Sequence, residues 1–170
     1  LSPLEGMPLE ELGVSGDVGK TLGVTDLSPL KGMRLKFLSI AQNSSLSDIS
    51  ALAGMPLDWL VATGTIIDSL EPPRGIKLRQ LALIRTRVTD LSPLKDMPLE
   101  ALELNSTPVS DLTPLQSLPL TELNLLGCDA LSDCSPLKGM SLKRVFLDFD
   151  AERDTEWLRS LKDLEQINGK

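Results

Sequence analysis

Apolar residues recur along this chain with one spacing, Leu-x-x-Leu-x-Leu, which appears seven times with conservative replacements from Leu9 to Leu147. Residues 90–111, DLSPLKDMPLEALELNSTPVSD, show one complete unit, and related units return at steps of 21 or 22 residues. A period of this length is typical of a solenoid, in which each unit buries its apolar side chains against its neighbours.

The last two apolar positions of each copy alternate with polar or small residues, which predicts a short strand with one buried face. Because the same path leads from each strand to the next, the strands should run parallel in one sheet. Between strands, Asp-x-Ser-Pro combines a capping side chain with a proline suited to the first turn of a helix. The sequence therefore predicts an α/β repeat solenoid with seven parallel strands on a concave face and short 3₁₀ or α turns on the convex face.

The pattern divides the chain into an array over residues 1–150 and a C-terminal capping helix over residues 151–170. The first repeat is longer than the others, which predicts a loop insertion at 15–23. Asp154 is expected to cap the helix, and its buried face is expected to carry Trp157, Leu158, Leu161, Leu164 and Ile167. The chain opens within a repeat, so we expect a further repeat or domain upstream.

Several residue types hold fixed places in the repeat, which favours structural roles for them. One acidic column is expected to cap the outer turns: Asp26, Asp48, Asp90, Asp111 and Asp133. A polar column after each strand is expected to bond backbone groups at the bend: Asp17, Asn43, Thr65, Thr86, Thr107, Cys128 and Asp150. All five methionines share another column, which predicts a core stripe: Met7, Met33, Met55, Met97 and Met140.

Composition narrows the possible chemistry. Aromatic residues make up 3% of the chain, so stacked aliphatic side chains must form the core. The chain lacks histidine, and its two cysteines, Cys128 and Cys134, fall in structural columns, with a regulatory disulfide as the alternative. We therefore expect no enzymatic activity, no metal and no cofactor. The net charge of −7 argues against a nucleic-acid partner, and no apolar run is long enough to span a bilayer.

Two short motifs have a functional and an incidental interpretation. Gly19-Lys20-Thr21 resembles part of a phosphate-binding loop, but Val14 stands where that motif requires glycine and the repeat continues into the Asp26 turn. Asn43-Ser44-Ser45 and Asn105-Ser106-Thr107 match the glycosylation pattern. The incidental interpretation is favoured for both.

With these motifs in view, the pattern resembles short bacterial leucine-rich repeats, including the internalin type with its D-I-S-P-L outer turn. It is most similar to arrays in planctomycete bacteria that are often attached to serine/threonine protein kinases, with units of the type T-x-V-x-D-L-S-P-L-K-G-M-P-L. Their C-terminal tails resemble EWLRSLKDLEQINGK at 156–170. The resemblance implies a bacterial recognition domain and carries over no catalytic residue.

Once the structural columns are removed, the strand positions that point out of the sheet remain as candidates for binding. Three of the five aromatic residues lie among them, and Phe37 and Trp59 are in adjacent repeats. Such a cluster indicates either an interaction site or packing of neighbouring repeats on one another. The predicted partner-binding residues are Phe37, Ser39, Trp59, Val61, Gln80, Ala82, Ile84, Glu103, Asn105, Asn124 and Phe146.

The sequence thus predicts a monomeric module that binds an unidentified protein or peptide through the concave face, without nucleic acid or a membrane segment. The alternative is a structural spacer or a regulatory appendage of a larger protein, such as a bacterial serine/threonine kinase. The compartment stays open between cytoplasmic and extracytoplasmic, because it depends on what precedes Leu1.

Overall fold

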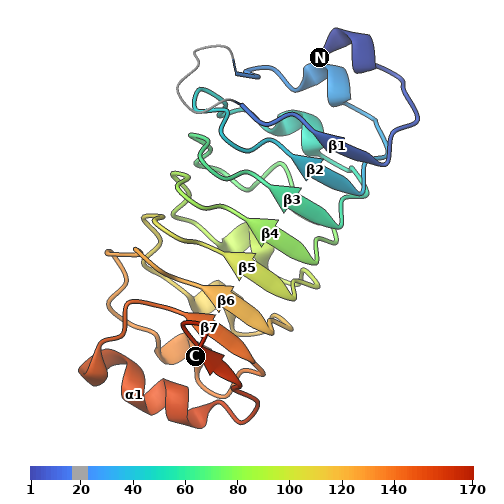
Figure 1. Cartoon of the computed structure of the whole chain (residues 1–170). Helices are drawn as coiled ribbons and strands as arrows, with labels where there is room; N and C mark the ends of the chain where they lie inside the picture. Colours follow the sequence, from blue (N-terminus) through green and yellow to red (C-terminus); the bar gives the residue numbers. More distant parts are fainter. Residues whose placement is uncertain (17–22) are drawn as a thin grey trace.

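The computed structural model describes residues 1–16 and 23–170, which form an elongated stack around one parallel sheet (Figure 1). The strands follow one another across the sheet in sequence order, and each pairs with the next. They are β1 (Glu11–Gly13), β2 (Phe37–Ser39), β3 (Trp59–Val61), β4 (Gln80–Ala82), β5 (Ala101–Glu103), β6 (Glu122–Asn124), β7 (Arg144–Phe146) and β8 (Gln166–Ile167).

The return path to the next strand is built mostly from short 3₁₀ helices, which lie behind the sheet (Figure 1). They are η1 (Ser2–Leu4), η2 (Ser28–Leu30), η3 (Ser50–Leu52), η4 (Ser92–Leu94), η5 (Thr113–Leu115) and η6 (Ser135–Leu137). Between β3 and β4 the path is a turn closed by a hydrogen bond from the Arg74 N–H to the Glu71 carbonyl. Pro72 and Pro73 occupy this turn, and neither has an N–H to donate.

The predicted aspartate caps are present. Asp26, Asp48, Asp90, Asp111 and Asp133 each accept a hydrogen bond from the backbone N–H two residues later, at 2.7 to 2.8 Å. This N–H belongs to the first residue of each 3₁₀ helix and would otherwise lack a partner. For Asp26, Asp48, Asp90 and Asp133 this backbone bond is the main cause of a lowered pKa; for Asp111 the side-chain bond to Thr113 is the larger cause.

The core runs through the stack as columns of aliphatic side chains. Leu35, Leu38 and Ile40 from one repeat are fully buried, as are their equivalents in later repeats. The methionine stripe is also buried, except for Met7, which is 43% exposed. Met7 belongs to the first repeat, which has a described neighbour on one side only.

The polar column also behaves as predicted from Asn43 to Cys128. The hydroxyls of Thr65, Thr86 and Thr107 each donate to the backbone carbonyl three residues earlier, at 2.7 to 2.8 Å. Asn43 does more, because its amide nitrogen donates to the carbonyls of Val14 and Ile40, and its oxygen accepts from the Val24 N–H. The threonines therefore close the bend within their own repeats, whereas Asn43 also joins its repeat to the preceding one.

The C-terminal region differs from the prediction. The helix α1 (Ala151–Ser160) is capped by Asp150, whose side chain accepts from the N–H groups of Glu152 and Arg153. The assignment of Asp154 as the cap was wrong. Asp150, the last member of the polar column, bonds backbone N–H groups after the strand as predicted, and in this repeat these groups begin the helix. Asp154 lies inside the helix and is buried. Its carboxylate accepts hydrogen bonds from Arg153, the Asp150 N–H and the Trp157 indole.

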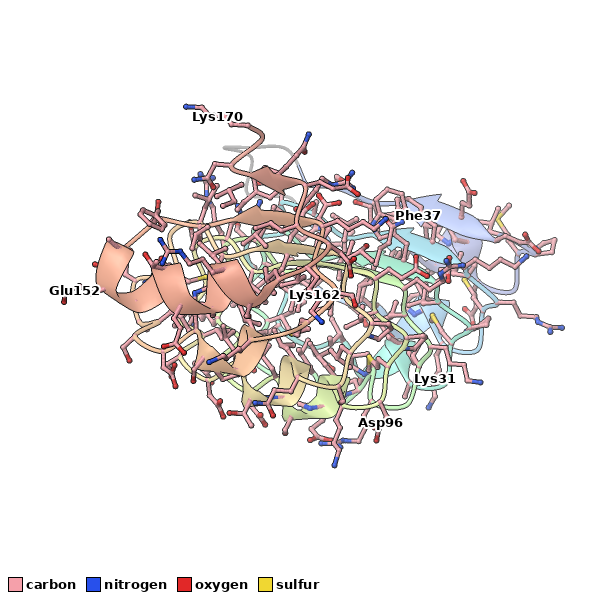
Figure 2. The ribbon with its side chains drawn as sticks, turned by 90° about the horizontal axis from the view of Figure 1, so that it is seen from below. Lys31, Phe37, Asp96, Glu152, Lys162 and Lys170 are labelled. Atoms are coloured by element: carbon pink, nitrogen blue, oxygen red, sulfur yellow. The ribbon has the colours of Figure 1, made fainter. Side chains whose placement is uncertain are left out.

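The chain after α1 returns to the sheet instead of extending the helix to residue 170. Ile167 pairs with Val145, so β8 adds an eighth strand to the seven that were predicted. Leu164 and Ile167 stand 22 residues after Leu142 and Val145, which makes residues 151–170 a final repeat. Seen along the stack from the C-terminal end, α1 lies on the outer side of this repeat, in the place of a 3₁₀ turn (Figure 2).

Two further predictions concern the loop insertion and membrane-spanning segments. Most of the loop insertion predicted at 15–23 lies outside the described residues, as does Gly19-Lys20-Thr21. Within the described residues, no helix is both long and apolar enough to cross a membrane.

Candidate functional site

The outward face of the sheet carries the candidate site. It consists of the first and third side chains of each strand, which point away from the buried central residue, and of the residue two positions after each strand. Parallel pairing in register places equivalent positions side by side, so that Trp59 lies between Phe37 and Gln80. Figure 2 shows Phe37 beside the strands, on the opposite side of the stack from Asp96.

Phe37 and Trp59 form the aromatic part of this face. Their ring centroids are 4.9 Å apart and the rings meet edge to face at 66°. Trp59 is 43% exposed, whereas Trp157, on the buried side of α1, is almost fully buried. A large aromatic side chain that remains exposed beside a second ring offers an apolar contact surface of defined geometry.

A shallow depression of about 190 Å³ adjoins Trp59 on the side away from Phe37. Its lining includes five outward-facing strand residues, Trp59, Val61, Gln80, Ala82 and Glu103, and all five belong to the predicted set. The prediction omitted Thr63 and Ala101, which also line the depression. The repeat places both residues at outward positions, but the space that their small side chains leave depends on the neighbouring strands.

Charges are unevenly distributed on this face. Arg144 is ion-paired with its neighbour Glu122, and the Asp148 carboxylate accepts from the Gly127 N–H. Glu103 is half-buried and has no hydrogen bond or ion pair to any residue that the structure describes. Burial, and to a smaller extent the neighbouring Glu122, raise the pKa of Glu103.

The predicted binding residues differ in how they relate to the depression. The Ser39 hydroxyl is 3.3 Å from that of Ser15, and Phe146 lies in β7, four strands beyond β3. Ala82 is only 8% exposed, so it serves as the floor of the depression more than as a contact residue. Ile84, Asn105 and Asn124 are half-buried, and the Asn105 Oδ1 atom is buried without a hydrogen-bond donor among the described residues.

The two cysteines are buried free thiols. Cys128 extends the polar column, since its sulfur donates to the Leu104 carbonyl at 3.1 Å. Burial raises the pKa of Cys128 and raises that of Cys134 to about 12. Because the thiolate is the reactive form, both side chains are poor nucleophiles.

No cluster of acidic or cysteine side chains in residues 1–16 and 23–170 has the arrangement of a metal site. The sheet face offers contact surface, hydrogen-bonding groups and, within the depression, the Glu103 carboxylate, which no described cation neutralises. These features suit binding of another molecule.

Comparison with solved structures places this geometry among known folds. The chain superposes on internalin C2 of Listeria monocytogenes with a TM-score of 0.71 and 29% sequence identity over 85% of its length. It superposes on internalin F of the same species with a TM-score of 0.74 and 23% identity over 98% of its length. The chain is a leucine-rich repeat solenoid. The predicted fold class is therefore confirmed, together with the likeness to internalin-type repeats.

The chain spans 66% of internalin C2 and 56% of internalin F, so the likeness concerns part of each protein. No protein-family model and no curated protein sequence matches the chain. The internalin neighbours favour a protein-interaction module of the leucine-rich repeat type as the general role.

Proposed function

We propose that this leucine-rich repeat chain binds a protein or peptide segment across the outward face of its sheet, with Phe37 and Trp59 as the apolar anchor. The observation that carries the proposal is the 43% exposure of Trp59 beside Phe37, in a fold that buries its other tryptophan. Tryptophan is enriched among the residues that contribute most to binding energy at protein interfaces.

The shape of the face favours an extended partner. Neighbouring strands are about 4.8 Å apart, so outward side chains form rows across the repeats. A peptide that crosses the strands would meet Phe37 and Trp59 first, then the depression, and then Glu103 and Asn124. This order places an apolar anchor beside more polar contacts, which is the usual composition of a specific interface.

The charge of the outward face bears on the class of partner. The partner is a protein or peptide and not a nucleic acid, since the only cation among the outward strand residues, Arg144, is paired with Glu122. The module acts as a monomer, without catalysis or a cofactor. The second candidate, which rests on the resemblance inferred from the sequence alone, is a structural spacer or a regulatory appendage of a larger protein such as a bacterial serine/threonine kinase.

Selection from a displayed library of random dodecapeptides on the immobilised chain tests the proposal. Peptides enriched on the wild-type chain should lose most of their binding to the double variant Phe37→Ala/Trp59→Ala. Phe149→Ala is the matched control, because Phe149 is 57% exposed but lies outside the strands. The thermal midpoint of the double variant should stay close to that of the wild type, since Trp59 contributes little to the core.

Enriched peptides that bind the double variant as well as the wild type would contradict the proposal. A failure to enrich any peptide on the wild-type chain would contradict it as well. Loss of binding in Phe149→Ala alone would move the site from the sheet to the C-terminal end.

A further inference from the structure

The depression beside Trp59 owes its shape to small side chains. Trp59 and Glu103 lie two strands apart. Gln80 and Ala82 are on the strand between them, and Ala101 follows Gln80 in the row that begins at Trp59. The short side chains of Ala82 and Ala101, with Gln80 beside Trp59, leave a trough about 10 Å long, given the spacing of neighbouring strands. One end of the trough is therefore aromatic, its floor is aliphatic, and its other end is acidic.

The volume of the trough limits what it can hold. Its 190 Å³ is well below the range of about 300–1,000 Å³ that is typical of small-molecule sites. A single long side chain of a bound peptide fits a space of this size better than a cofactor or a metabolite.

The acidic end lacks a counter-charge in the described chain. Glu122 is the nearest acidic neighbour, and Arg144 neutralises it, but no cation reaches Glu103. A half-buried carboxylate without a partner costs free energy, because burial removes water and nothing replaces it. The elevated pKa of Glu103 reflects this burial. A structural role would not require such a residue, whereas a cationic ligand would use it.

We infer that the trough between Trp59 and Glu103 binds a basic side chain, arginine or lysine, of the partner peptide. This inference rests on the proposed function of the outward face. The aliphatic stem of the basic residue lies on Ala82 and Ala101 beside Trp59, as such stems commonly cover apolar surface. Its charged end meets the Glu103 carboxylate, where a charge-assisted hydrogen bond replaces the lost water.

Other side chains fit the trough less well. An apolar residue would cover Ala82 and Ala101 but would bury Glu103 further without neutralising it. An acidic residue would face both Glu103 and Glu122. The charge of the trough thus selects a partner that presents a cation next to an apolar residue, the latter for Phe37 and Trp59.

The dodecapeptides enriched on the full chain provide the test. They should share an arginine or lysine next to an apolar residue. Resynthesis with citrulline in place of arginine, or norleucine in place of lysine, removes the charge and keeps the aliphatic stem of the side chain. This replacement should weaken binding about tenfold, as expected for the loss of a charge-assisted contact.

Glu103→Gln should weaken binding of the unmodified peptides by a similar factor. It should also abolish the difference in affinity between the charged and uncharged peptides. Glu100→Gln is the matched control, because it removes the same charge from the same repeat, where Glu100 is paired with Arg79 outside the trough. The affinity of Glu100→Gln for the unmodified peptides should equal that of the wild-type chain.

The outcomes separate this inference from the function on which it depends. Some peptides could lose binding to Phe37→Ala/Trp59→Ala but contain no basic residue, or tolerate both citrulline and Glu103→Gln. Such peptides would overturn the inference that a basic side chain occupies the trough, and would leave the sheet face as the binding site. Peptides that are indifferent to the aromatic variants would overturn both. Equal losses in Glu103→Gln and Glu100→Gln would show a general effect of charge and would also overturn the inference.

Discussion

Single residues in this solenoid are constrained first by the backbone. The bend after the outer turn has a positive φ in most repeats, and glycine occupies it at Gly6, Gly32, Gly54, Gly75 and Gly139. In the η4 repeat the same position is Asp96, with φ +65°. Glycine adopts this conformation without the steric cost that a side chain brings, although aspartate tolerates it better than most residues.

Asp96→Gly should therefore raise the free energy of unfolding by about 0.5–1 kcal/mol, because the relief of strain exceeds the entropy that glycine adds to the unfolded chain. The midpoint of urea denaturation measures the change. The converse variant, Gly75→Ala at φ +82°, should lower the midpoint even though no atom lies near the added methyl group. An unchanged or lower midpoint for Asp96→Gly would refute the argument from strain.

Asp154 offers a second prediction for a single residue. Its carboxylate is fully buried and accepts from Arg153, the Asp150 N–H and the Trp157 indole. Asp154→Ala would leave these donors unpaired, and should cost about 2–4 kcal/mol, somewhat less than a fully buried pair because Arg153 is partly exposed. Calorimetric unfolding measures the loss, and Glu152→Ala in the exposed first turn of α1 is the control.

The pH dependence follows from the same contacts. Burial raises the pKa of Asp154, but the hydrogen bonds from Arg153, Asp150 and Trp157 outweigh it, so the pKa in the folded state is lowered. The stabilisation is therefore present above the unfolded pKa of about 4 and is lost as the pH falls through the folded value. The difference in stability between wild type and Asp154→Ala should shrink below about pH 4, and a constant difference would contradict this account.

At the scale of elements, the sequence predicted those parts that every repeat shares. The strands, the aspartate caps and the polar column were legible because each stands at the same place in units of 21 or 22 residues. The final unit was missed because its outer turn is replaced by α1, and helical spacing masked the repeat. Leu164-x-x-Ile167 still carried the signal, since it repeats the spacing of Leu142 and Val145.

This final unit covers the end of the stack. Trp157, Leu158 and Leu161 are buried against the core, and Asn168 exchanges two hydrogen bonds with the backbone of Leu147. Removal of residues 151–170 would expose the apolar side of the β7 repeat, and in a solenoid such damage also weakens the neighbouring repeats. The truncated chain should melt at a lower temperature and aggregate, as measured by thermal unfolding and sedimentation.

Truncation after Asn168 is the control for this experiment, because it keeps β8 and the bonds to Leu147. A truncation at residue 150 that remains soluble and unfolds at the wild-type temperature would show that the stack needs no cover at this end.

At the scale of the whole molecule, the repeat explains why the candidate site was only partly predictable. Pattern alone placed Phe37, Trp59 and Glu103 on the outward face. It did not show that Phe37 and Trp59 touch edge to face, or that Ala82 and Ala101 leave a trough between Trp59 and Glu103. These features depend on side chains from several repeats at once, and they emerge only when the units are stacked in register.

The unpaired carboxylate links this site to the stability of the whole stack. Glu103 is half-buried, and its pKa is raised by burial and by nearby Glu122, whose own charge is paired with Arg144. A carboxyl group whose folded pKa is raised lowers the stability of the folded state wherever it is ionised, and this cost disappears as the pH falls through that pKa. Residues kept for binding often carry such a cost.

Glu103→Gln should therefore raise the free energy of unfolding at pH 7 by a small amount, below about 1 kcal/mol because solvent screens a half-exposed group. The gain should shrink as the pH falls through the raised pKa of Glu103, since the wild-type side chain then becomes neutral as well. Urea denaturation at pH 7 and pH 4 measures both effects. Glu100→Gln is the control, because it loses the ion pair to Arg79 and should not raise the free energy of unfolding. If Glu103→Gln lowered the stability at pH 7, the carboxylate would contribute to the fold, and the case for a cationic partner would lose its main support.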